Sequence, residues 1–556
     1  MKYLSLILII AVLSCNHETK YDTIIRNGLI YDGNGGTPYK ADIAINADTI
    51  AFIGQIKNAS SKNEIDANGK AVAPGFINMM GHSEESLFQD GRAQSDIRQG
   101  VTTEIFTESS FGPLNAKMKN QFQKNQGDIK YDVSWNTLGE YMNTLEHKGI
   151  SCNIASFVGA GTVRQYVIGE DDKAPTQQQL DSMKILVDTA MHEGALGLTC
   201  ALIYPPDNFA TTGELIALAK EASKYGGTYI SHIRSEGNQL IPAVNEIITI
   251  AKQANIPVEI CHLKAAGKDN WNKMDSVIKI VEEARKQGID ITADMYTYTA
   301  AATGLTSCFP PTLQDGGFGK LRERLRNPSI RKQMITAMHT NANNWENLYY
   351  GCGGPGNILL LSFKQDSLKK FTGKTLAQVA AIRGKSPEET AMNLIVQDST
   401  RVGVAYFLMD ENNIKKEIVL PWVSFGSDEG SYTNEGVFLK SNAHPRAYGN
   451  FARVIGKYSR DEKLMTLQQA IYKLSKLPAT HLKLKKRGEL KVGNYADIVI
   501  FEPAGVQDHA TYEKPHQYAT GVSDVFINGK QVLKNNEHTG AVPGRFLKGA
   551  GYGKSL

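Results

Sequence analysis

The sequence predicts an α/β fold: a closed (β/α)8 barrel of the TIM type, a small β-sandwich made from the two ends of the chain, and an insertion between the last two barrel strands. Apolar runs alternate with helical patterns through the middle of the chain, and short β-type segments lie at both ends. Apolar strands separated by helices indicate a parallel sheet that is covered on both faces. Eight such units favour closure into a barrel.

The barrel strands are expected where continuous apolar runs occur. A capping box of Thr176 and Gln179 precedes one helical pattern, and Gly194 is placed to end that helix. A doubly wound open sheet is the alternative fold, but no glycine-rich phosphate loop follows the first strand, which favours the barrel. The eight runs are Val72–Ile77, Val101–Phe106, Cys152–Val158, Ala195–Cys200, Thr228–His232, Val258–His262, Ile289–Asp294 and Trp422–Asp428.

The terminal segments are expected to pack together, because neither contains enough apolar surface to form a domain alone. Asn27-Gly28 and Asn528-Gly529 are dipeptides typical of tight hairpin turns, one in each segment. The expected boundaries are 1–20 for a signal peptide and tether, 21–73 and 481–556 for the two parts of the sandwich, 74–480 for the barrel, and about 301–419 for the insertion, which is too long for a barrel loop.

The N-terminus has the pattern of an export signal. Lys2 precedes an apolar stretch from Leu4 to Leu13, which is too short to span a bilayer and ends in Ser14-Cys15. A cysteine after a small residue resembles the lipobox of bacterial lipoproteins. We therefore expect lipid on Cys15, membrane attachment through that lipid, and an exported protein that is periplasmic-facing or an outer-membrane lipoprotein. An ordinary signal with an incidental cysteine is the alternative.

The charge balance argues against a nucleic-acid partner. Lys and Arg number 61 and Asp and Glu 57, so the formal net charge is only +4. A nucleic-acid-binding protein of this length normally carries a basic excess or a basic stripe. Hydrophobic residues make up 41% of the chain and charged residues 21%, which indicates a large buried core rather than a disordered protein.

Ionisable side chains gather where a barrel places its chemistry, at the carboxyl ends of its strands. His232 and His262 end consecutive strands, so their imidazoles are expected within reach of one ion. A single histidine after an apolar run is more often a structural residue, but two in this arrangement favour a metal site. The residues at expected strand ends are His82, Glu108, His232, His262, Asp294 and Asp428.

Several segments carry a resemblance to a known family. Pro74–His82 resembles the first-strand signature of the amidohydrolase superfamily. Others are similar to its D-aminoacylase branch, the N-acyl-D-amino-acid deacylases, and together they cover the chain from about Tyr21 to the C-terminus in family order. They are Gln99–Thr103, Ser231–Arg234, His262–Lys264, Asp294–Tyr298, Gly426–Gly430, His444–Arg446, Arg487–Leu490 and Gly493–Asp497.

The resemblance implies metal ligands, with two departures. The strand-ending histidines of the family match His232 and His262, its last-strand aspartate matches Asp428, and the second histidine of its His-x-His pair matches His82. The first histidine of that pair falls on Met80, whose thioether is a poor ligand for Zn²⁺. A second metal is therefore in doubt.

The other departure concerns the bridging cysteine of the family, which falls on Ser109, next to Glu108. A serine hydroxyl is a poor zinc ligand and a carboxylate is a good one, so Glu108 is the expected ligand. A catalytic zinc needs three protein ligands and one open position. We therefore expect one Zn²⁺ per chain, held by His232, His262 and Glu108.

The reaction that this resemblance implies is hydrolysis of N-acyl-D-amino acids or related amides, and a bound metal would activate the water. Asp428 is expected to move the proton from water to the departing amine. Tyr296 or Tyr298 would donate to the oxyanion. A small-molecule substrate with a free carboxylate requires a fixed cation, and the candidates are Lys264, Arg446 and Arg234.

Two alternatives remain open at this point. One is hydrolysis of cyclic amides, as in hydantoinases and dihydroorotases, which usually employ a bridging carbamylated lysine that has no convincing strand-ending candidate here. The other is a surface lipoprotein that binds a ligand without catalysis. Retention of His232, His262 and Asp428 argues against that alternative.

Overall fold

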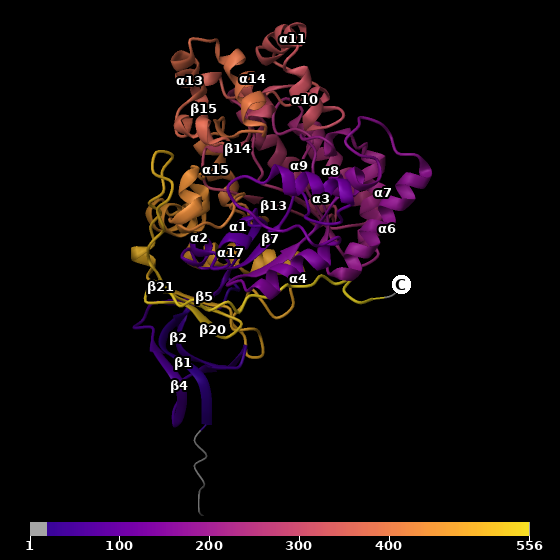
Figure 1. Cartoon of the computed structure of the whole chain (residues 1–556). Coiled ribbons are helices and arrows are strands. Elements are labelled where there is room, and N and C mark those ends of the chain that lie inside the picture. Colours follow the sequence, from indigo (N-terminus) through magenta and orange to yellow (C-terminus); the bar gives the residue numbers. More distant parts are fainter. Residues whose placement is uncertain (1–18, 555–556) are drawn as a thin grey trace, which may run out of the picture.

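The computed structural model describes residues 19–554, so the expected signal peptide and Cys15 lie outside the described residues. Within this range the chain forms a barrel, a terminal sheet domain on one side of it, and an insertion on the other (Figure 1). The described N-terminus lies at the far tip of the sheet domain. The predicted fold class, an α/β barrel with an additional sheet domain and an insertion, is confirmed.

The barrel consists of parallel strands, and hydrogen bonds close it. The amide of Asp428 donates to the carbonyl of Met80 over 2.8 Å, and that of His82 donates to Glu429 over 2.9 Å, which joins the first strand to the last. The third unit is split, because β8 pairs with β7 whereas β9 pairs with β10. The strands are β6 (Phe76–Gly81), β7 (Val101–Phe106), β8 (Asn153–Ser156), β9 (Val158–Gly159), β10 (Gly197–Ala201), β11 (Thr228–His232), β12 (Val258–Ile260), β13 (Ile291–Met295) and β17 (Val423–Phe425).

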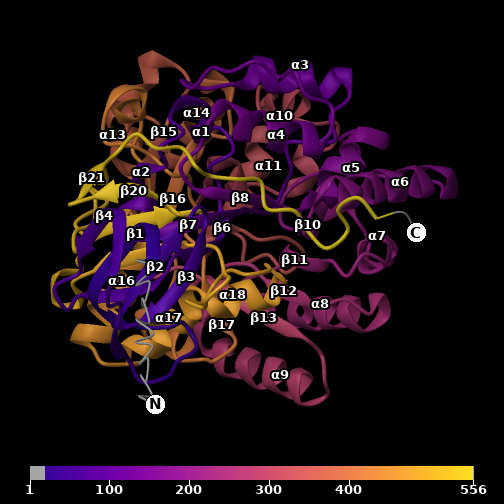
Figure 2. The ribbon, with the colours of Figure 1, turned by 90° about the horizontal axis from the view of Figure 1, so that it is seen from below.

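Helices surround these strands on the outside (Figure 2). The capping box of Thr176 and Gln179 is present at the start of α6, and Gly194 ends that helix at a φ of 114°, as predicted. The helices outside the insertion are α1 (Ser86–Gln89), α2 (Gln94–Ile97), α3 (Ala116–Asn125), α4 (Leu138–Lys148), α5 (Ala160–Val167), α6 (Gln177–Glu193), α7 (Thr212–Ser223), α8 (Leu240–Ala254), α9 (Met274–Lys286), α16 (Arg446–Arg453), α17 (Leu467–Leu474) and α18 (Lys476–His481).

The two ends of the chain form one hydrogen-bonded sheet rather than the two sheets of a sandwich. β5 pairs with β18 in antiparallel register, with Val72 opposite Ile500, and this pairing joins the N-terminal strands to the C-terminal ones. Ile25, Ile43 and Phe526 are buried in a shared apolar core. The strands are β1 (Thr19–Ile30), β2 (Tyr39–Asn46), β3 (Thr49–Gly54), β4 (Ala59–Asp66), β5 (Ala71–Pro74), β18 (Ile498–Phe501), β19 (Val522–Ile527), β20 (Lys530–Lys534) and β21 (Glu537–His538).

The two Asn-Gly dipeptides behave differently. Asn528-Gly529 forms the predicted hairpin turn between β19 and β20, with φ values of 47° and 76°. The prediction for Asn27-Gly28 is wrong, because β1 runs through it with a bulge between Ile25 and Gly28. Gly28 is required there by close packing, since a Cβ atom would lie 2.7 Å from the side chain of Val72.

The last residues do not remain in the sheet domain, which differs from the expected boundary. After β21 the chain runs back along the base of the barrel (Figure 2). The amide of Gly544 donates to Ile150, that of Leu547 donates to Ile154, and that of Gly549 donates to Gly194. Residues 543–549 therefore pack on the barrel beside β8 and α6.

The insertion lies between β13 and β17 and has its own core. β16 (Gly403–Phe407) pairs in antiparallel register with β14 (Ala300–Gly304) on one side and β15 (Ile358–Ser362) on the other. Leu305, Leu360 and Tyr406 are fully buried within it. Its helices are α10 (Phe318–Arg324), α11 (Pro328–Met338), α12 (Leu348–Gly351), α13 (Leu376–Arg383), α14 (Pro387–Asp398) and α15 (Glu411–Ile418).

A buried polar network joins the sheet domain to the barrel. The carboxylate of Asp497 pairs with Arg487 and accepts the amide of Asn528 over 2.8 Å. The side-chain amide of Asn528 donates in turn to Asn153 of β8 over 2.8 Å. Because Asp497 and Arg487 are both buried, each depends on the other for charge compensation.

We predict that Asp497→Ala lowers the free energy of unfolding by about 3–5 kcal/mol, because it leaves a buried guanidinium without its counter-charge. Asp461→Ala is the matched control: it removes the partner of Arg460 in a solvent-exposed pair, which is worth at most about 1 kcal/mol. Urea unfolding and thermal melting of both variants provide the measurement. Equal stability losses in the two variants would contradict the assigned role of Asp497.

Candidate metal centre and active site

Three side chains from three barrel strands converge at the carboxyl ends of the barrel. Glu108 follows β7, His232 ends β11 and His262 follows β12. Nδ1 of His232 and Nε2 of His262 each donate to the same oxygen of Glu108, Oε1, over 3.0 Å. The structure therefore brings together the three residues that we expected to hold zinc.

The backbone turns these side chains inward by adopting a left-handed conformation. φ is 65° at Glu108, 35° at His262 and 52° at Asp428, values that residues other than glycine rarely adopt. Hydrogen bonds hold all three turns: the amide of Glu108 donates to Thr199 over 2.8 Å, that of His262 donates to Asp294 over 3.1 Å, and that of Asp428 donates to the carbonyl of Met80 over 2.8 Å. Such strained positions occur preferentially at functional sites. The hydrogen bond to the Asp294 carboxylate thus fixes the backbone of His262.

The imidazoles keep the Glu108 carboxylate charged. Burial raises the pKa of Glu108, but hydrogen bonds from His232 and His262 outweigh burial and hold the pKa well below its usual range. Burial and Lys264 lower the pKa of His262, whereas Glu236 and Glu108 raise it, with a result of about 10. Without metal, protonated imidazole therefore provides the positive charge that the carboxylate requires.

The donor set fits a zinc ion. One carboxylate and two imidazoles offer ligand atoms that all lie within 4.8 Å of one another. Nε2 of His232 is buried and has no hydrogen-bond partner among residues 19–554. Two histidines and a carboxylate with one open position are a typical catalytic zinc set. Glu108, His232 and His262 would hold that ion.

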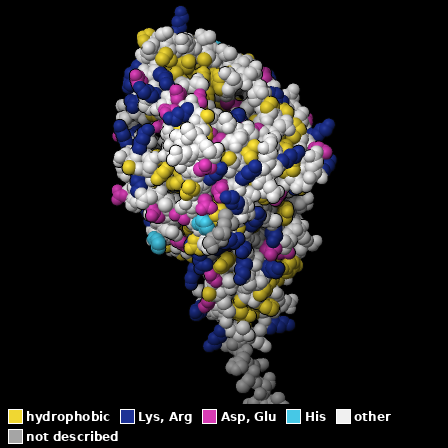
Figure 3. Space-filling view, turned by 90° about the vertical axis from the view of Figure 1, so that its right-hand side faces the viewer, with side chains coloured by type: hydrophobic (Ala, Val, Ile, Leu, Met, Phe, Trp, Pro, Cys, Tyr) yellow, Lys and Arg dark blue, Asp and Glu magenta, His cyan; other side chains and the backbone are white. Residues whose placement is uncertain are grey.

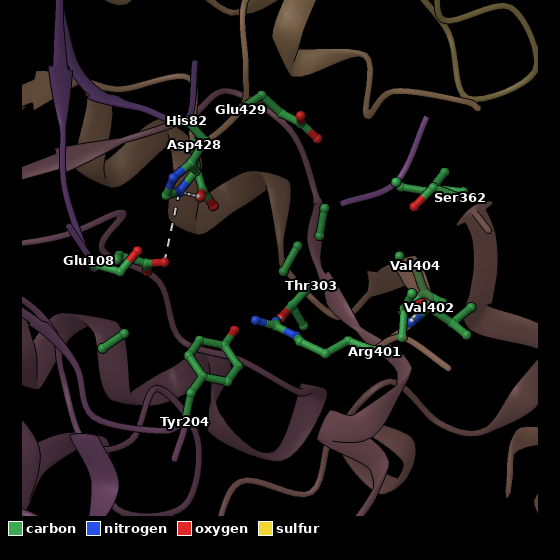
Figure 4. Close-up of a pocket in the computed structure, with 18 of the residues that line it drawn as sticks. His82, Glu108, Tyr204, Thr303, Ser362, Arg401, Val402, Val404, Asp428 and Glu429 are labelled. Atoms are coloured by element: carbon green, nitrogen blue, oxygen red, sulfur yellow. Dashed lines mark hydrogen bonds and ion pairs between the residues drawn. The ribbon is translucent and has the colours of Figure 1, made fainter. Parts of the chain in front are cut away.

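A second group of side chains faces the other oxygen of Glu108 (Figure 4). Nε2 of His82 lies 3.8 Å from Oε2 of Glu108 and donates to Oδ1 of Asp428 over 3.2 Å. Oδ2 of Asp428 pairs with Arg446 over 2.7 Å. Burial raises the pKa of Asp428, but Arg446 and the hydrogen bond from His82 lower it below its usual value. Asp428 is therefore an ionised carboxylate beside the metal ligands.

Met80 does not take part in this group. Its side chain is fully buried in an apolar cluster with Ile77, Ile105 and Ile230. Its carbonyl instead accepts the amide of Asp428 and so helps to close the barrel. The position that the family resemblance assigns to a histidine is here part of the packed barrel interior.

Sequence reasoning missed Glu236, which belongs to the site. Its Oε1 lies 3.0 Å from Nδ1 of His262 and accepts from Lys264 over 2.5 Å, while its Oε2 lies 3.8 Å from Nε2 of His232. Burial raises the pKa of Glu236, but Lys264 and the two histidines lower it well below its usual range. Its position four residues after His232 was the available signal. Glu236 therefore holds the imidazole of His262 in place on the side opposite Glu108, and its charge lies close to the imidazole of His232.

The expected substrate-binding residues divide into two groups. Lys264, Arg446 and Tyr296 line the cavity above the metal ligands. Arg234 and Tyr298 lie outside its lining. Arg234 pairs with Glu246 over 2.9 Å and donates to backbone carbonyls, and Tyr298 packs beneath the guanidinium of Arg453 at 4.4 Å. These contacts support structural roles for both residues.

The cavity has a volume of about 940 Å³ and lies between the barrel and the insertion. Tyr204 and the metal-binding residues line it from the barrel side, and strands of the insertion form the opposite wall (Figure 4). The insertion contributes Thr303, Ser362, Arg401, Val402 and Val404. A small molecule in this cavity would contact both parts of the chain.

Comparisons with known proteins agree with this geometry. The family model described as "Amidohydrolase family" matches residues 63–533. The chain belongs to the amidohydrolase family. A D-aminoacylase of Alcaligenes xylosoxydans xylosoxydans is 29% identical over 540 residues, which cover 96% of this chain and 99% of that protein. The predicted resemblance to this branch is confirmed.

Solved structures separate the branch from more distant relatives. N-acyl-D-glutamate deacylase from Bordetella bronchiseptica, complexed with zinc and a phosphonate inhibitor, is 26% identical with a TM-score of 0.78 over 95% of this chain and 100% of that chain. An L-hydantoinase from Arthrobacter aurescens is 14% identical with a TM-score of 0.54 over 95% of this chain and 100% of its own. The second similarity shows a shared fold alone.

We predict that Glu108→Gln protein loses most of its zinc, because the amide removes the only carboxylate of the three-ligand set. Ser109→Ala is the matched control at the adjacent, exposed position and should retain close to one zinc per chain. Elemental analysis of protein purified with zinc and then dialysed gives the metal content. Loss of zinc from the Ser109 variant alone would show that the hydroxyl, not the carboxylate, is the ligand.

Proposed function

We propose that this chain is a zinc-dependent hydrolase that removes the acyl group from N-acyl-D-amino acids. The observation that carries the proposal is the convergence of Glu108, His232 and His262 on one point of an open cavity, with the ionised Asp428 beside them. Similarity to D-aminoacylase and to N-acyl-D-glutamate deacylase over nearly the whole chain supports the substrate class.

The metal site and Asp428 have separate roles in the proposed reaction. A zinc ion in this site supplies a Lewis acid that acidifies water and polarises a carbonyl. Asp428 lies next to the ligands with one oxygen on His82 and the other on Arg446, and it is ionised, so it accepts the proton of the attacking water. Asp428 then returns this proton to the nitrogen of the departing amine, which leaves poorly as an anion.

Tyr296 and Arg446 are placed to bind the substrate. The hydroxyl of Tyr296 is buried and has no hydrogen-bond partner within the described part of the chain, and burial keeps its pKa well above the usual value. It therefore remains a donor for a substrate oxygen. The guanidinium of Arg446 lies 4.4 Å above the Tyr296 ring, and Lys264 lies 5.5 Å from the same ring. Together they form a cationic wall that suits the α-carboxylate of an amino acid.

The alternatives are less well supported. The carboxylate between the two groups of site residues belongs to Glu108, so no carbamylated lysine is needed, and the likeness to hydantoinase extends to the fold only. A binding protein without catalysis would not require an ionised carboxylate beside a three-ligand metal set. We therefore favour amide hydrolysis of N-acyl-D-amino acids.

We predict that Asp428→Asn lowers kcat by roughly two to four orders of magnitude, the usual worth of a positioned general base, while one zinc per chain is retained. His262→Ala is the comparison variant and should lose both zinc and activity, because two ligands remain. Turnover of N-acetyl-D-amino acids and of their L forms, with zinc content measured on the same samples, distinguishes the two effects. Asp428→Asn protein without zinc would identify the aspartate as a principal ligand instead.

We also propose that the chain is an exported lipoprotein attached to a membrane through Cys15. The described chain starts at the tip of the sheet domain, and the insertion lies on the opposite side of the barrel (Figure 1). The cavity is lined by the barrel and the insertion, so attachment through the sheet domain leaves the site accessible. Figure 3 shows basic and acidic side chains mixed on the narrow end of the molecule. None of the helices in residues 19–554 is both long and apolar enough to cross a bilayer.

We predict that the full-length chain sediments with membranes and that Cys15→Ala moves it into the soluble fraction, because the acyl chains are then absent. His17→Ala, two residues away, should remain with membranes. Fractionation of cells expressing each form provides the measurement. A Cys15→Ala protein that stays on membranes after a high-salt wash would refute lipid attachment at this residue.

A further inference from the structure

Arg401 lines the cavity and has no acidic partner in the described part of the chain. Among the same residues, Lys364 also lines the cavity without a carboxylate partner, but its ammonium donates to the backbone carbonyl of Lys124 over 2.8 Å. Arg446 and Lys264, the cations assigned to the α-carboxylate, each also have a carboxylate partner in the protein, Asp428 and Glu236 respectively. Arg401 is exposed to solvent, and across residues 19–554 no carboxylate forms an ion pair with it; its side-chain hydrogen bond goes to the neutral hydroxyl of Thr303 over 2.7 Å. Its positive charge is therefore available to a ligand.

The insertion holds this guanidinium in place. The stem of Arg401 packs where Gly304 has no side chain, because a Cβ atom at Gly304 would lie 2.7 Å from both Cβ and Nε of Arg401. The next residue, Val402, has a φ of 55°, a conformation that is strained for a β-branched side chain. Strain of this kind persists only where surrounding contacts impose it. Arg401 is thus built into the cavity wall rather than being a free surface arginine.

The ring of Tyr204 lies between Arg401 and the metal ligand His232. The ring of Tyr204 contacts the ring of His232 with centroids 5.4 Å apart, and the guanidinium of Arg401 lies 4.9 Å from the centroid of the same Tyr204 ring. Figure 4 shows Arg401 and Thr303 facing the same space as Glu108 and Asp428. A substrate whose amide is at the metal ligands can therefore reach Arg401 with another part of its structure.

We propose that Arg401 and Thr303 form a second anion subsite and that the preferred substrate carries a second carboxylate, besides the α-carboxylate. The inference rests on the proposed function and specifies its substrate class. A guanidinium binds a carboxylate with two parallel hydrogen bonds, which are stronger than those between neutral groups. The second carboxylate can belong to the amino-acid side chain or to the acyl group, and both present the same chemistry to Arg401.

The test uses zinc-loaded full-length protein and two substrate pairs. N-acetyl-D-glutamate and N-acetyl-D-glutamine differ in the charge of the side chain. N-succinyl-D-alanine and N-butyryl-D-alanine differ in the charge of the acyl group. We expect kcat/KM to be about 10- to 100-fold higher for the charged member of one pair, the usual worth of charge-assisted hydrogen bonds.

Variants test whether Arg401 causes the preference for the charged substrate. Arg401→Gln should abolish the preference and leave kcat/KM for the neutral member within about threefold, since that substrate makes no charge-assisted bond there. Arg383→Gln is the matched control. Like Arg401, Arg383 lies against an aromatic ring, that of Phe371, and donates to a neutral side chain. Arg383 differs in lying outside the cavity lining. Gly304→Ala should weaken the preference by displacing the stem of Arg401.

The outcomes distinguish the second anion subsite from the proposed hydrolase activity. No preference in either pair, or a preference that survives Arg401→Gln, overturns the second subsite while hydrolysis of N-acyl-D-amino acids still stands. Failure to hydrolyse any of the four compounds refutes the proposed function instead. In that case, calorimetric binding of the same pairs to Asp428→Asn protein, with and without Arg401→Gln, still decides whether Arg401 selects a second carboxylate.

Discussion

The shared carboxylate of Glu108 is the interaction on which the site depends. One of its oxygens faces His232 and His262, and the other faces His82, which is bonded to Asp428. Burial alone would favour a neutral acid, and the surrounding imidazoles reverse this preference. Since these groups come from β6, β7, β11, β12 and the end of β17, the site forms only when the barrel is closed.

The barrel also supplies the rigidity that the site requires. Glu108, His262 and Asp428 all adopt left-handed backbone conformations, which cost of order 1–3 kcal/mol each in residues other than glycine. Each of these residues has its amide anchored: Glu108 to Thr199, His262 to Asp294, and Asp428 to the carbonyl of Met80. The packed interior thus compensates for strain at the strand ends, and the side chains point into the cavity.

Much of this arrangement could be predicted because it depends on local pattern. Strand-ending polar residues after apolar runs identified Glu108, His232 and His262, since parallel strands align their carboxyl ends by topology. Contacts set by tertiary packing could not be predicted in this way. Asn27-Gly28 became a bulge instead of a turn because Val72 approaches it closely, and Arg401 is brought to the cavity by pairing of β14 with β16, about a hundred residues apart.

The barrel and the insertion contribute different walls of the cavity. The ligands and Asp428 belong to barrel strand ends, where a substitution alters zinc binding or proton transfer. Thr303 lies in β14 and Arg401 lies two residues before β16, in an insertion with its own buried core, so that wall can change while the ligand geometry is preserved. The proposed second anion subsite therefore lies in a segment that contains none of the metal ligands, and contact with Tyr204 joins this segment to them.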